Sequence, residues 1–273
     1  MSTGTVRWME KVRLDILLAQ RGVFDSRSRA AASVIAGEVK LGDERRRAEK
    51  PGLLVPSDVM VAVDEAPAFV SRGGRKLANA LDATGIDPAG RRCLDVGAST
   101  GGFTDCLLQR GAAHVVALDV AYGELHWRLR NDVSVTPIER SNARELQPAA
   151  LPYAPDLIVI DVSFISIAKL LGPVLACAAD RHDCLAMCKP QFEAGREQVG
   201  KGGVVRDPAA RREAMVAVAR AAERLGASVL GFAASGLPGP KGNLETFVWL
   251  GEPGRRGRLE GAAIEAAARE VEP

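Results

Sequence analysis

CLDVGASTGGFTD, residues 93–105, has the pattern of a buried strand that turns through glycines into a helix. The apolar run stops at Gly97, and Gly101 and Gly102 allow close approach of a ligand before a helical pattern begins at Phe103. A second apolar strand, 114–120, contains Asp119, an acid about 20 residues after the first glycine, where it can accept hydrogen bonds from ribose hydroxyls. The segment therefore predicts a site for a nucleoside cofactor.

The spacing of the glycines bears on which cofactor is bound. A dinucleotide fingerprint requires glycine at the positions of Gly97, Ser99 and Gly102, and its middle glycine lets the backbone touch a pyrophosphate. Because Ser99 carries a side chain, the pattern favours a ligand without a pyrophosphate, and S-adenosylmethionine is such a ligand. Dinucleotide binding and a glycine turn that is only structural are the alternatives.

We expect the backbone of this turn to hold most of the cofactor. Asp95 is predicted to lie near its methionine end and Asp119 at its ribose. Asn142, after the third strand, either reads the adenine edge or caps a helix over 143–146. The predicted cofactor-binding residues are Asp95, Gly97, Ala98, Ser99, Thr100, Gly101, Gly102, Asp119 and Asn142.

Composition indicates a globular chain with a basic N-terminal end. The 273 residues are 47% hydrophobic, and no apolar run approaches the roughly 18 residues of a transmembrane helix. The N-terminus lacks the apolar core of a signal peptide, so we expect a cytoplasmic protein. Residues 1–50 contain 11 Lys and Arg against 7 Asp and Glu, which indicates a polyanionic partner. The five cysteines lack a paired Cys-x-x-Cys spacing, so we expect reduced thiols and no metal site.

Residues 1–64 are predicted to form a small module with two short helices. Two apolar stripes of helical period lie within 14–35, Ser26 can cap the second helix, and Gly37 can end it before a strand over 39–41. Its basic residues form either a solvated face or a nucleic-acid surface. The candidate RNA-binding residues, with two at the entrance of the next module, are Arg13, Arg21, Ser26, Arg27, Arg29, Lys40, Arg72 and Arg75.

After a linker over 65–70, residues 71–273 alternate between apolar strands and amphipathic helices. Besides the two strands above, strands are predicted over 133–138, 156–160, 184–188, 227–234 and 245–250. Helices are predicted over 124–130, 167–176 and 209–225. This alternation predicts an α/β fold with an open, mostly parallel sheet, whose ligands bind at the carboxyl ends of the strands.

Four polar residues fall where one cleft at those ends could collect them. Asp161 ends an apolar strand, where a carboxylate normally needs a partner, and Lys189 follows the strand over 184–188. Lys76 lies on the helix that enters the sheet, and Glu245 begins the last strand. A single lysine after a strand is more often a surface residue, so the prediction of a catalytic cleft depends on the set of four.

The motifs resemble two known domains. Residues 13–64 resemble the small RNA-binding domain first described in ribosomal protein S four, through Arg13, Leu14, Asp15, Gly22, Ser26, Arg27, Ile35, Gly37 and Val39. The remainder resembles the FtsJ-like ribose methyltransferases, through SRGGRKL, DVGASTGGFTDCLLQRGA, DVSFIS, KPQFEAGR with GGVVRD, and GNLE. The combination resembles the TlyA family, which is often labelled hemolysin and includes enzymes that methylate cytidine 2′-hydroxyls in ribosomal RNA.

The resemblance implies a Rossmann-like class I methyltransferase fold with a mostly parallel seven-stranded sheet, a small N-terminal α+β RNA-binding domain, and S-adenosylmethionine as cofactor. Its implied partner is 16S or 23S ribosomal RNA, or the ribosomal subunits. Lys76, Asp161, Lys189 and Glu245 match the family's Lys-Asp-Lys-Glu tetrad. In this interpretation Lys189 orients the 2′-hydroxyl and takes its proton, Lys76 is the neighbouring cation, and the two acids balance their charge.

Several alternatives stay open. Before Val70 the linker reads Ala-Pro-Ala-Phe, where members that act on both ribosomal subunits often have Arg-x-Trp-Val, so the substrate is one subunit or both. A membrane-active hemolysin, an RNA-binding regulator with a decayed fold, and a methyltransferase for another RNA, a base, DNA or protein are the other candidates. Amino-methylating sites typically offer Asn or Asp before Pro-Pro-Tyr, whereas Asp161 is followed by Val-Ser-Phe.

Overall fold

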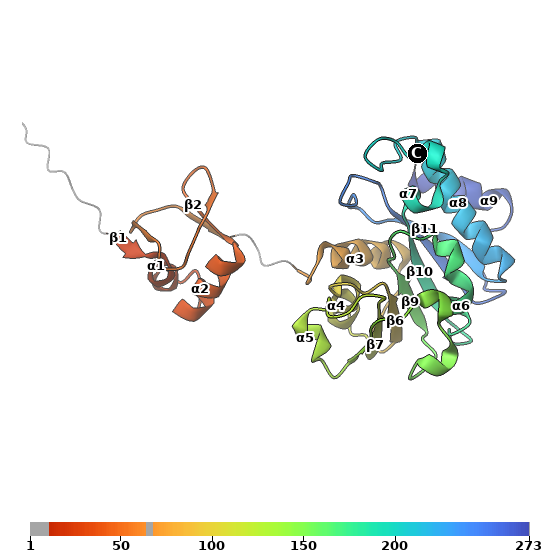
Figure 1. Cartoon of the computed structure of the whole chain (residues 1–273), viewed down its shortest axis with the longest axis horizontal. Coiled ribbons are helices and arrows are strands. Elements are labelled where there is room, and N and C mark those ends of the chain that lie inside the picture. Colours follow the sequence, from red (N-terminus) through yellow and green to blue (C-terminus); the bar gives the residue numbers. More distant parts are fainter. Residues whose placement is uncertain (1–10, 64–67, 273) are drawn as a thin grey trace, which may run out of the picture. The chain divides into compact units, whose positions relative to one another are not determined.

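The computed structural model describes residues 11–63 and 68–272, and the chain divides into two compact units, 1–68 and 69–273 (Figure 1). The division falls within the predicted linker 65–70, of which residues 65–67 lie outside the described residues. The first unit contains one two-stranded and one three-stranded sheet, and the second contains a single seven-stranded sheet.

The first unit is a small α+β module. Leu14, Leu18 and Val34 are at most 1% exposed and form its core where the two helices meet the strands. Ser26 accepts a hydrogen bond from the Arg29 amide at 3.2 Å, as predicted for a helix cap. The elements are β1 (Lys11–Arg13), α1 (Leu14–Gln20), α2 (Arg27–Ala36), β2 (Val39–Leu41), β3 (Arg46–Arg47), β4 (Leu54–Pro56) and β5 (Val61–Val63). β1 pairs with β4, and β2 lies between β3 and β5, all antiparallel.

The prediction of a mostly parallel seven-stranded sheet is confirmed in the second unit. The strands are β6 (Arg92–Val96), β7 (His114–Leu118), β8 (Val135–Ile138), β9 (Leu157–Ile160), β10 (Asp183–Cys188), β11 (Ser228–Ala234) and β12 (Thr246–Gly251). Their spatial order is β11-β12-β10-β9-β6-β7-β8. β12 runs antiparallel to both of its neighbours, and the pairs from β10 to β8 are parallel.

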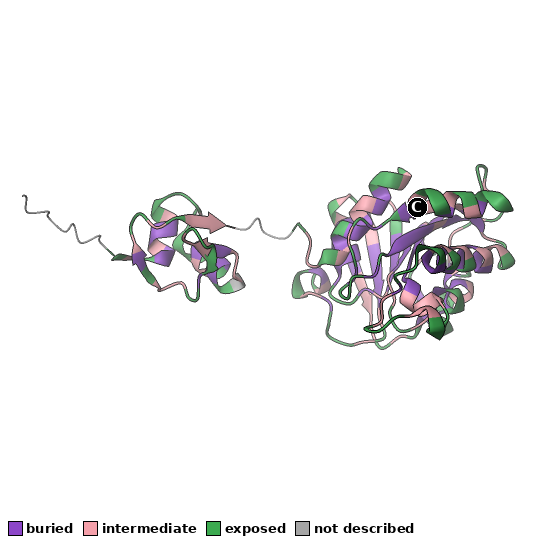
Figure 2. Cartoon of the chain, turned by 90° about the horizontal axis from the view of Figure 1, so that it is seen from above, coloured by how far each residue is buried: buried purple, intermediate pink, exposed green. Residues whose placement is uncertain are grey.

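Helices cover both faces of this sheet (Figures 1 and 2). α3 and α4 pack on one face, and α6, α8 and α9 pack on the other. The helices are α3 (Arg72–Thr84), α4 (Gly102–Gln109), α5 (Trp127–Arg130), α6 (Leu171–Leu175), α7 (Pro190–Glu193), α8 (Pro208–Arg224) and α9 (Ala262–Val271). Four 3₁₀ turns are η1 (Ala143–Glu145), η2 (Pro148–Ala150), η3 (Ile167–Lys169) and η4 (Arg196–Gln198).

Because both faces are covered, the central strands are apolar along their whole length. On β6, Cys93 belongs to the core under α3 and α4, whereas Leu94 and Val96 belong to the core under α6 and α8, and all three are fully buried. The same alternation places Asp95 on the α4 side. The order of strands reverses between β6 and β9, so the carboxyl ends of these two strands meet at the position where open α/β sheets bind ligands.

Two predicted helices differ in the structure. The helix predicted over 124–130 begins at Trp127, where the His126 side chain caps it by accepting from the Arg128 amide at 3.3 Å. The helix predicted over 167–176 divides into η3 and α6, because a continuous helix would place Pro173 in its interior, where the ring clashes with the preceding turn. The strand predicted from residue 133 begins at Val135.

The five cysteines are free and buried, and burial raises the pKa of Cys93 to about 12. In the ranges 11–63 and 68–272, no helix is long and apolar enough to cross a membrane. The same residues contain no cluster of three His, Cys, Asp or Glu side chains that could hold a metal ion.

Candidate active site

The glycine turn after β6 is shaped by close packing against its neighbours. Gly97 has φ +86°, and a side chain there would collide with the carbonyl oxygen of Asp161. Gly102 begins α4, and a Cβ there would lie 2.9 Å from the amide nitrogen of Gly74 on α3. Gly101 has φ +94° and abuts Leu129 of α5. The glycines predicted to admit a ligand therefore also allow β9, α3 and α5 to close around the turn.

A cavity of about 790 Å³ opens beside this turn. Its walls come from the start of α3, the glycine turn, the segments after β9 and β10, and the loop before β12. Among the predicted site residues, those that line it are Arg72, Lys76, Gly97, Ala98, Ser99, Thr100, Gly102, Asp161, Lys189 and Glu245. Five other predicted residues of the second unit do not line it, namely Arg75, Asp95, Gly101, Asp119 and Asn142.

The four residues predicted to share a cleft lie in this cavity as two lysine–carboxylate pairs. Nζ of Lys189 lies 2.5 Å from Oδ1 of Asp161 and donates to Oγ of Ser163 at 2.9 Å. Lys76 donates to Glu245, and their side chains are 9% and 1% exposed. Lys76 projects from α3, whereas the other three follow β9, follow β10 or precede β12. Strands distant in the sequence therefore bring two cations and two anions to one wall.

Asp95 lies beneath the turn, outside the cavity, and is fully buried. Its Oδ2 accepts hydrogen bonds from the amide of Thr104 at 2.9 Å and from the Thr104 hydroxyl at 2.7 Å. Within the described part of the chain, its Oδ1 has no hydrogen-bond partner. Burial raises the pKa of Asp95 to about 7, because the opposing hydrogen bonds from Thr104 only partly offset the loss of water.

Asp119 and Asn142 both accept hydrogen bonds from backbone amides. Asp119 receives the Ser99 amide at 2.7 Å, which ties the glycine turn to the end of β7, and the Ala121 amide at 2.8 Å. Asn142 caps η1 by accepting from the Arg144 amide at 3.1 Å, which was one of its two predicted roles. Contacts of these residues with ribose and adenine stay predictions.

An exposed apolar residue follows Asp119, and sequence reasoning did not select it. The exposed fraction of Val120 is 72%. The available signal was an apolar side chain directly after the acid that is predicted to bind ribose. Such a side chain offers a surface for a flat ring.

Phe164 is a second residue that sequence reasoning missed. It is 91% exposed, lines the cavity, and has φ +66°, a left-handed conformation that bulky side chains rarely adopt. Its ring lies 5.4 Å from the ring of Phe192, at an interplanar angle of 51°. The signal was an aromatic residue in a loop three positions after Asp161. A strained, exposed aromatic beside a cavity indicates a contact with a ligand.

Several predicted RNA-binding residues hold the first unit together. Arg13 and Arg27 pair with the buried carboxylate of Asp15 at 3.0 Å and 2.8 Å. The hydrogen bond from Arg13, with the help of Arg27, holds the pKa of Asp15 far below its usual range. Arg21 donates to the carbonyl oxygen of Val59 at 2.7 Å. These contacts give the three arginines a structural role, and their binding to RNA stays a prediction.

The remaining basic candidates lie on α2, β2 and α3. Arg29 is exposed on α2 and Lys40 lies in β2. Arg72 lines the cavity and donates to the Pro238 carbonyl at 2.9 Å, and Arg75 is exposed one turn further along α3.

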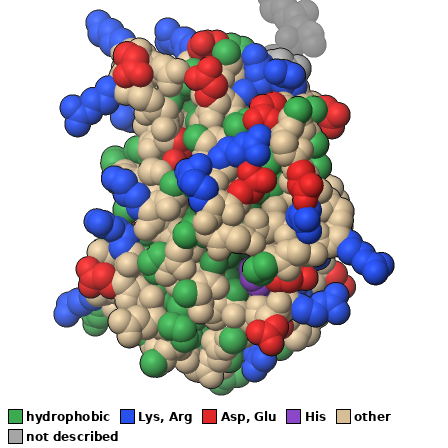
Figure 3. All heavy atoms as spheres, turned by 90° about the vertical axis from the view of Figure 1, so that its right-hand side faces the viewer, with side chains coloured by type: hydrophobic (Ala, Val, Ile, Leu, Met, Phe, Trp, Pro, Cys, Tyr) green, Lys and Arg blue, Asp and Glu red, His purple; other side chains and the backbone are tan. Residues whose placement is uncertain are grey.

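The face of the second unit in Figure 3 has Lys and Arg interspersed with Asp and Glu, which is not the one-sign surface that a polyanion requires.

Among the comparisons with known proteins, the family match lies in the second unit, and the matches to whole proteins cover most of the chain. The FtsJ-like methyltransferase family matches residues 69–252. The 16S/23S rRNA (cytidine-2'-O)-methyltransferase TlyA of Mycobacterium tuberculosis is 50% identical over 88% of this chain and 90% of its own. Hemolysin A of Brachyspira hyodysenteriae is 36% identical over 86% of this chain and 97% of its own. The solved structure of a hemolysin-named protein from Streptococcus thermophilus, 35% identical, matches with a TM-score of 0.72 over 96% of both chains.

Proposed function

This chain belongs to the TlyA family of FtsJ-like methyltransferases, and on that premise we propose that it transfers a methyl group from S-adenosylmethionine to a ribose 2′-hydroxyl, that of a cytidine, in ribosomal RNA. The substrate class comes from the M. tuberculosis relative, which is named for both 16S and 23S RNA. A ribosomal substrate implies action in the cytoplasm.

One observation carries the proposal, namely the two lysine–carboxylate pairs beside a glycine turn in one cavity. A base-methylating enzyme must recognise a flat heterocycle at the reacting atom, whereas a ribose hydroxyl requires a group that orients an alcohol and accepts its proton. Lys189 is suited to that role because Asp161 and Ser163 hold its Nζ at two sides while the side chain still reaches the cavity.

The residues around the turn fit S-adenosylmethionine. The backbone from Gly97 to Gly102 would hold the cofactor, Asp119 would receive its ribose hydroxyls, and Val120 would cover one side of the adenine. Asp95, whose Oδ1 has no hydrogen-bond partner among the described residues, lies buried beneath the same turn. When bound, the cofactor supplies a sulfonium methyl group that is already activated for transfer.

The chain's own part of the reaction is to position the nucleophile and to move a proton. Lys189 would orient the 2′-hydroxyl. As its oxygen bonds to the methyl carbon, the bond from that carbon to the sulfonium sulfur would break and leave a neutral thioether, and the hydroxyl proton would pass to Nζ of Lys189 and then to solvent. For this step Lys189 must be unprotonated when the hydroxyl reacts, since an ammonium group cannot accept a proton. Positioning of this kind can lower a barrier by about 7 kcal/mol.

Phe164 and Phe192 extend the proposal to the nucleotide. Because Phe164 is exposed and its backbone is strained, we assign its ring as a stacking surface for the target base or its neighbour. The basic residues of the first unit and Arg72 would contact the phosphates.

The test is transfer of labelled methyl from S-adenosylmethionine to purified small and large ribosomal subunits that lack the modification. We expect label on RNA, mapped to a ribose 2′-oxygen, and its loss in Lys189→Ala with cofactor binding retained. Lys169→Ala is the matched control, because Lys169 is an exposed lysine on η3 outside the cavity. A wild-type protein that binds the cofactor but labels neither subunit contradicts the ribosomal substrate, and a protein that does not bind it contradicts the assignment of the glycine turn.

A further inference from the structure

The segment between β9 and η3 and the segment that contains α7 lie side by side in the site. The first, residues 161–167, carries Asp161 and Phe164, and the second, residues 189–193, carries Lys189 and Phe192. Two links described above join them, the contacts of Lys189 with Asp161 and Ser163 and the contact between the phenylalanine rings. Both of these links involve residues that would touch the substrate.

A third link joins the segments away from the cavity. Oε2 of Glu193 accepts a hydrogen bond from Oγ of Ser166 at 2.6 Å, and Oε1 accepts one from the amide of Ile167 at 2.7 Å. Ile167 is 1% exposed and is the first residue of η3, so its amide has no acceptor within that turn. Glu193 therefore caps η3 from another segment. It does not line the cavity.

Burial of the Glu193 carboxylate is unfavourable for its charged form. Burial raises its pKa above the usual value, and the hydrogen bonds from Ser166 and Ile167 partly oppose that rise. Both of these donors are neutral groups. A partly buried carboxylate held by neutral donors of another segment adds little to stability compared with an apolar residue, which indicates a role in fixing geometry.

The segment that Glu193 holds contains a strained residue. Between Asp161 and Ile167 the backbone passes through the left-handed conformation of Phe164, whose ring is in solvent apart from its contact with Phe192. Such a residue costs about 1–3 kcal/mol and persists only where its surroundings hold it. Apolar neighbours of Phe164 in the segment pack on the core and Lys189 contacts its first half, whereas the two hydrogen bonds to Glu193 are the polar contacts from α7 that hold its second half.

We propose that Glu193 is a positioning residue of the methyl-transfer site, which fastens the 161–167 segment to α7 and so sets Asp161 and Phe164 relative to Lys189. This proposal rests on the proposed function for its catalytic consequence, but not for the contact itself. Glu193 acts through the residues that it fastens and does not touch the substrate.

The test compares three variants of the full-length chain. Glu193→Ala removes both acceptors, Glu193→Gln keeps one oxygen that can accept from the Ile167 amide, and Glu197→Ala removes an exposed acid four residues further on. Hydrogen–deuterium exchange is measured on peptides that cover 163–170 and, as reference, 72–84. Methyl transfer to ribosomal subunits gives kcat and KM, and calorimetry gives the cofactor Kd.

We expect Glu193→Ala to speed exchange at 163–170 by about tenfold or more, with 72–84 unchanged, and to lower kcat by about tenfold with cofactor Kd within about twofold. Glu193→Gln should recover at least about a third of kcat, and Glu197→Ala should match wild type. Unchanged exchange at 163–170 overturns the proposal whatever the activity, and so does faster exchange with wild-type kcat. If wild-type protein labels neither subunit, the proposed function fails, and the exchange measurement alone decides whether Glu193 fastens the segment.

Discussion

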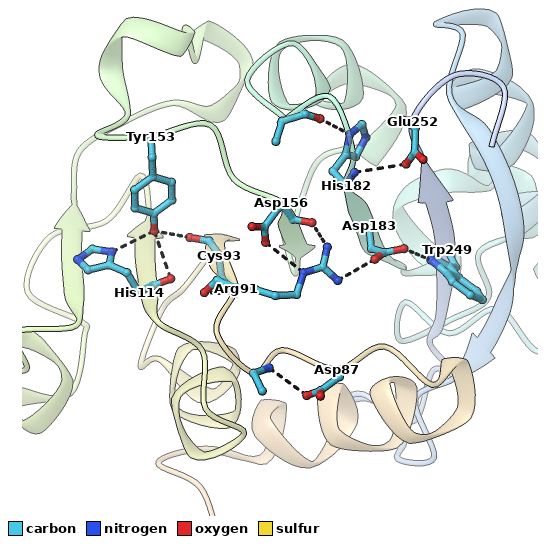
Figure 4. A network of polar contacts seen from close by, with 12 residues as sticks. Asp87, Arg91, Cys93, His114, Tyr153, Asp156, His182, Asp183, Trp249 and Glu252 are labelled. Atoms are coloured by element: carbon cyan, nitrogen blue, oxygen red, sulfur yellow. Dashed lines mark hydrogen bonds and ion pairs between the residues drawn. The ribbon is translucent and has the colours of Figure 1, made fainter. Parts of the chain in front are cut away.

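Ion pairs lie at both ends of the parallel strands of the central sheet. We call the side where these strands begin the amino edge and the side where they end the carboxyl edge. At the amino edge, Arg91 bonds to Asp156 at 3.1 Å and to Asp183 at 2.7 Å, and Trp249 donates its indole N–H to Asp183 at 3.0 Å (Figure 4). Arg91, Asp156 and Asp183 precede or begin β6, β9 and β10, and Trp249 lies in the antiparallel β12, so the network ties the starts of three strands to a fourth. At the carboxyl edge, the two lysine–carboxylate pairs face the cavity and the glycine turn.

The comparison shows that burial of charge does not by itself indicate a catalytic site. In the network the side-chain exposures are 20% for Arg91, 32% for Asp156 and 8% for Asp183. In the proposed catalytic pair they are 11% for Lys189 and 25% for Asp161, so the two ranges overlap. The carboxyl edge differs because its charged side chains line a cavity that could hold a ligand. Removing a structural ion pair should lower stability and leave kcat nearly unchanged, whereas removing a catalytic one should lower kcat. The following variants measure both quantities.

The largest effect is expected for Lys189→Ala. Removing the proposed proton acceptor should lower kcat by about 1,000-fold, whereas the thermal midpoint should change little, because Asp161 remains partly exposed to water. Single-turnover methyl transfer together with a thermal unfolding scan tests both parts. A variant that keeps near wild-type kcat would remove the distinction between the two edges.

Lys76→Ala is expected to affect both activity and stability, because its partner is deeply buried. The Glu245 side chain is 1% exposed, so loss of Lys76 leaves an unpaired buried carboxylate at a cost of about 3 kcal/mol. The double variant Lys76→Met with Glu245→Gln should recover most of that stability and none of the activity. Recovery of both would show that this pair, like the network at the amino edge, is structural.

Arg91→Ala should show the opposite profile from Lys189→Ala. Loss of its bonds to Asp156 and Asp183 is expected to cost about 2 kcal/mol of unfolding free energy, because Arg255 and Trp249 still hold Asp183. Measured at a temperature where the variant is folded, kcat should stay within about twofold of wild type. A large fall in kcat without destabilisation would place the amino edge in the catalytic machinery.

The sequence was sufficient to predict the sheet and the four residues of the site, because these depend on hydrophobic periodicity and on positions at strand ends. Apolar strands separated by helices determine a sheet with two covered faces, and Lys76, Asp161, Lys189 and Glu245 then fall at one edge. Which lysine pairs with which acid depends on the order of strands in space. The spatial order of the strands places Glu245, just before β12, beside Lys76 of α3. No local sequence pattern predicts this pairing.

Other features depend on contacts between distant segments. Arg13, Arg21 and Arg27 carry charge that sequence reasoning assigns to RNA, yet Asp15 and the backbone of the first unit already bind them. Phe164 was missed because periodicity describes buried residues and not an exposed ring in a loop. The position of Pro173 would have been enough to predict the break between η3 and α6.

The smallest effect is expected for Asp95→Asn, and it depends on pH. The pKa of Asp95 is raised to about 7 by burial, so the native carboxyl keeps a proton that the unfolded chain releases near pH 4. Wild-type stability should therefore fall as pH rises from about 4 to about 7 and then level off, whereas an asparagine does not titrate. Near pH 4 the variant should be less stable than wild type, because its amide nitrogen is a buried donor without a partner at every pH.

Above pH 7 the advantage of Asp95→Asn should be modest, about 1 kcal/mol, because its amide nitrogen would replace the unpartnered Oδ1 with another buried atom that lacks a partner. Urea unfolding from pH 4 to pH 9 measures the difference, with the exposed Asp180→Asn as control. An advantage that does not change with pH would mean that Asp95 is ionised throughout.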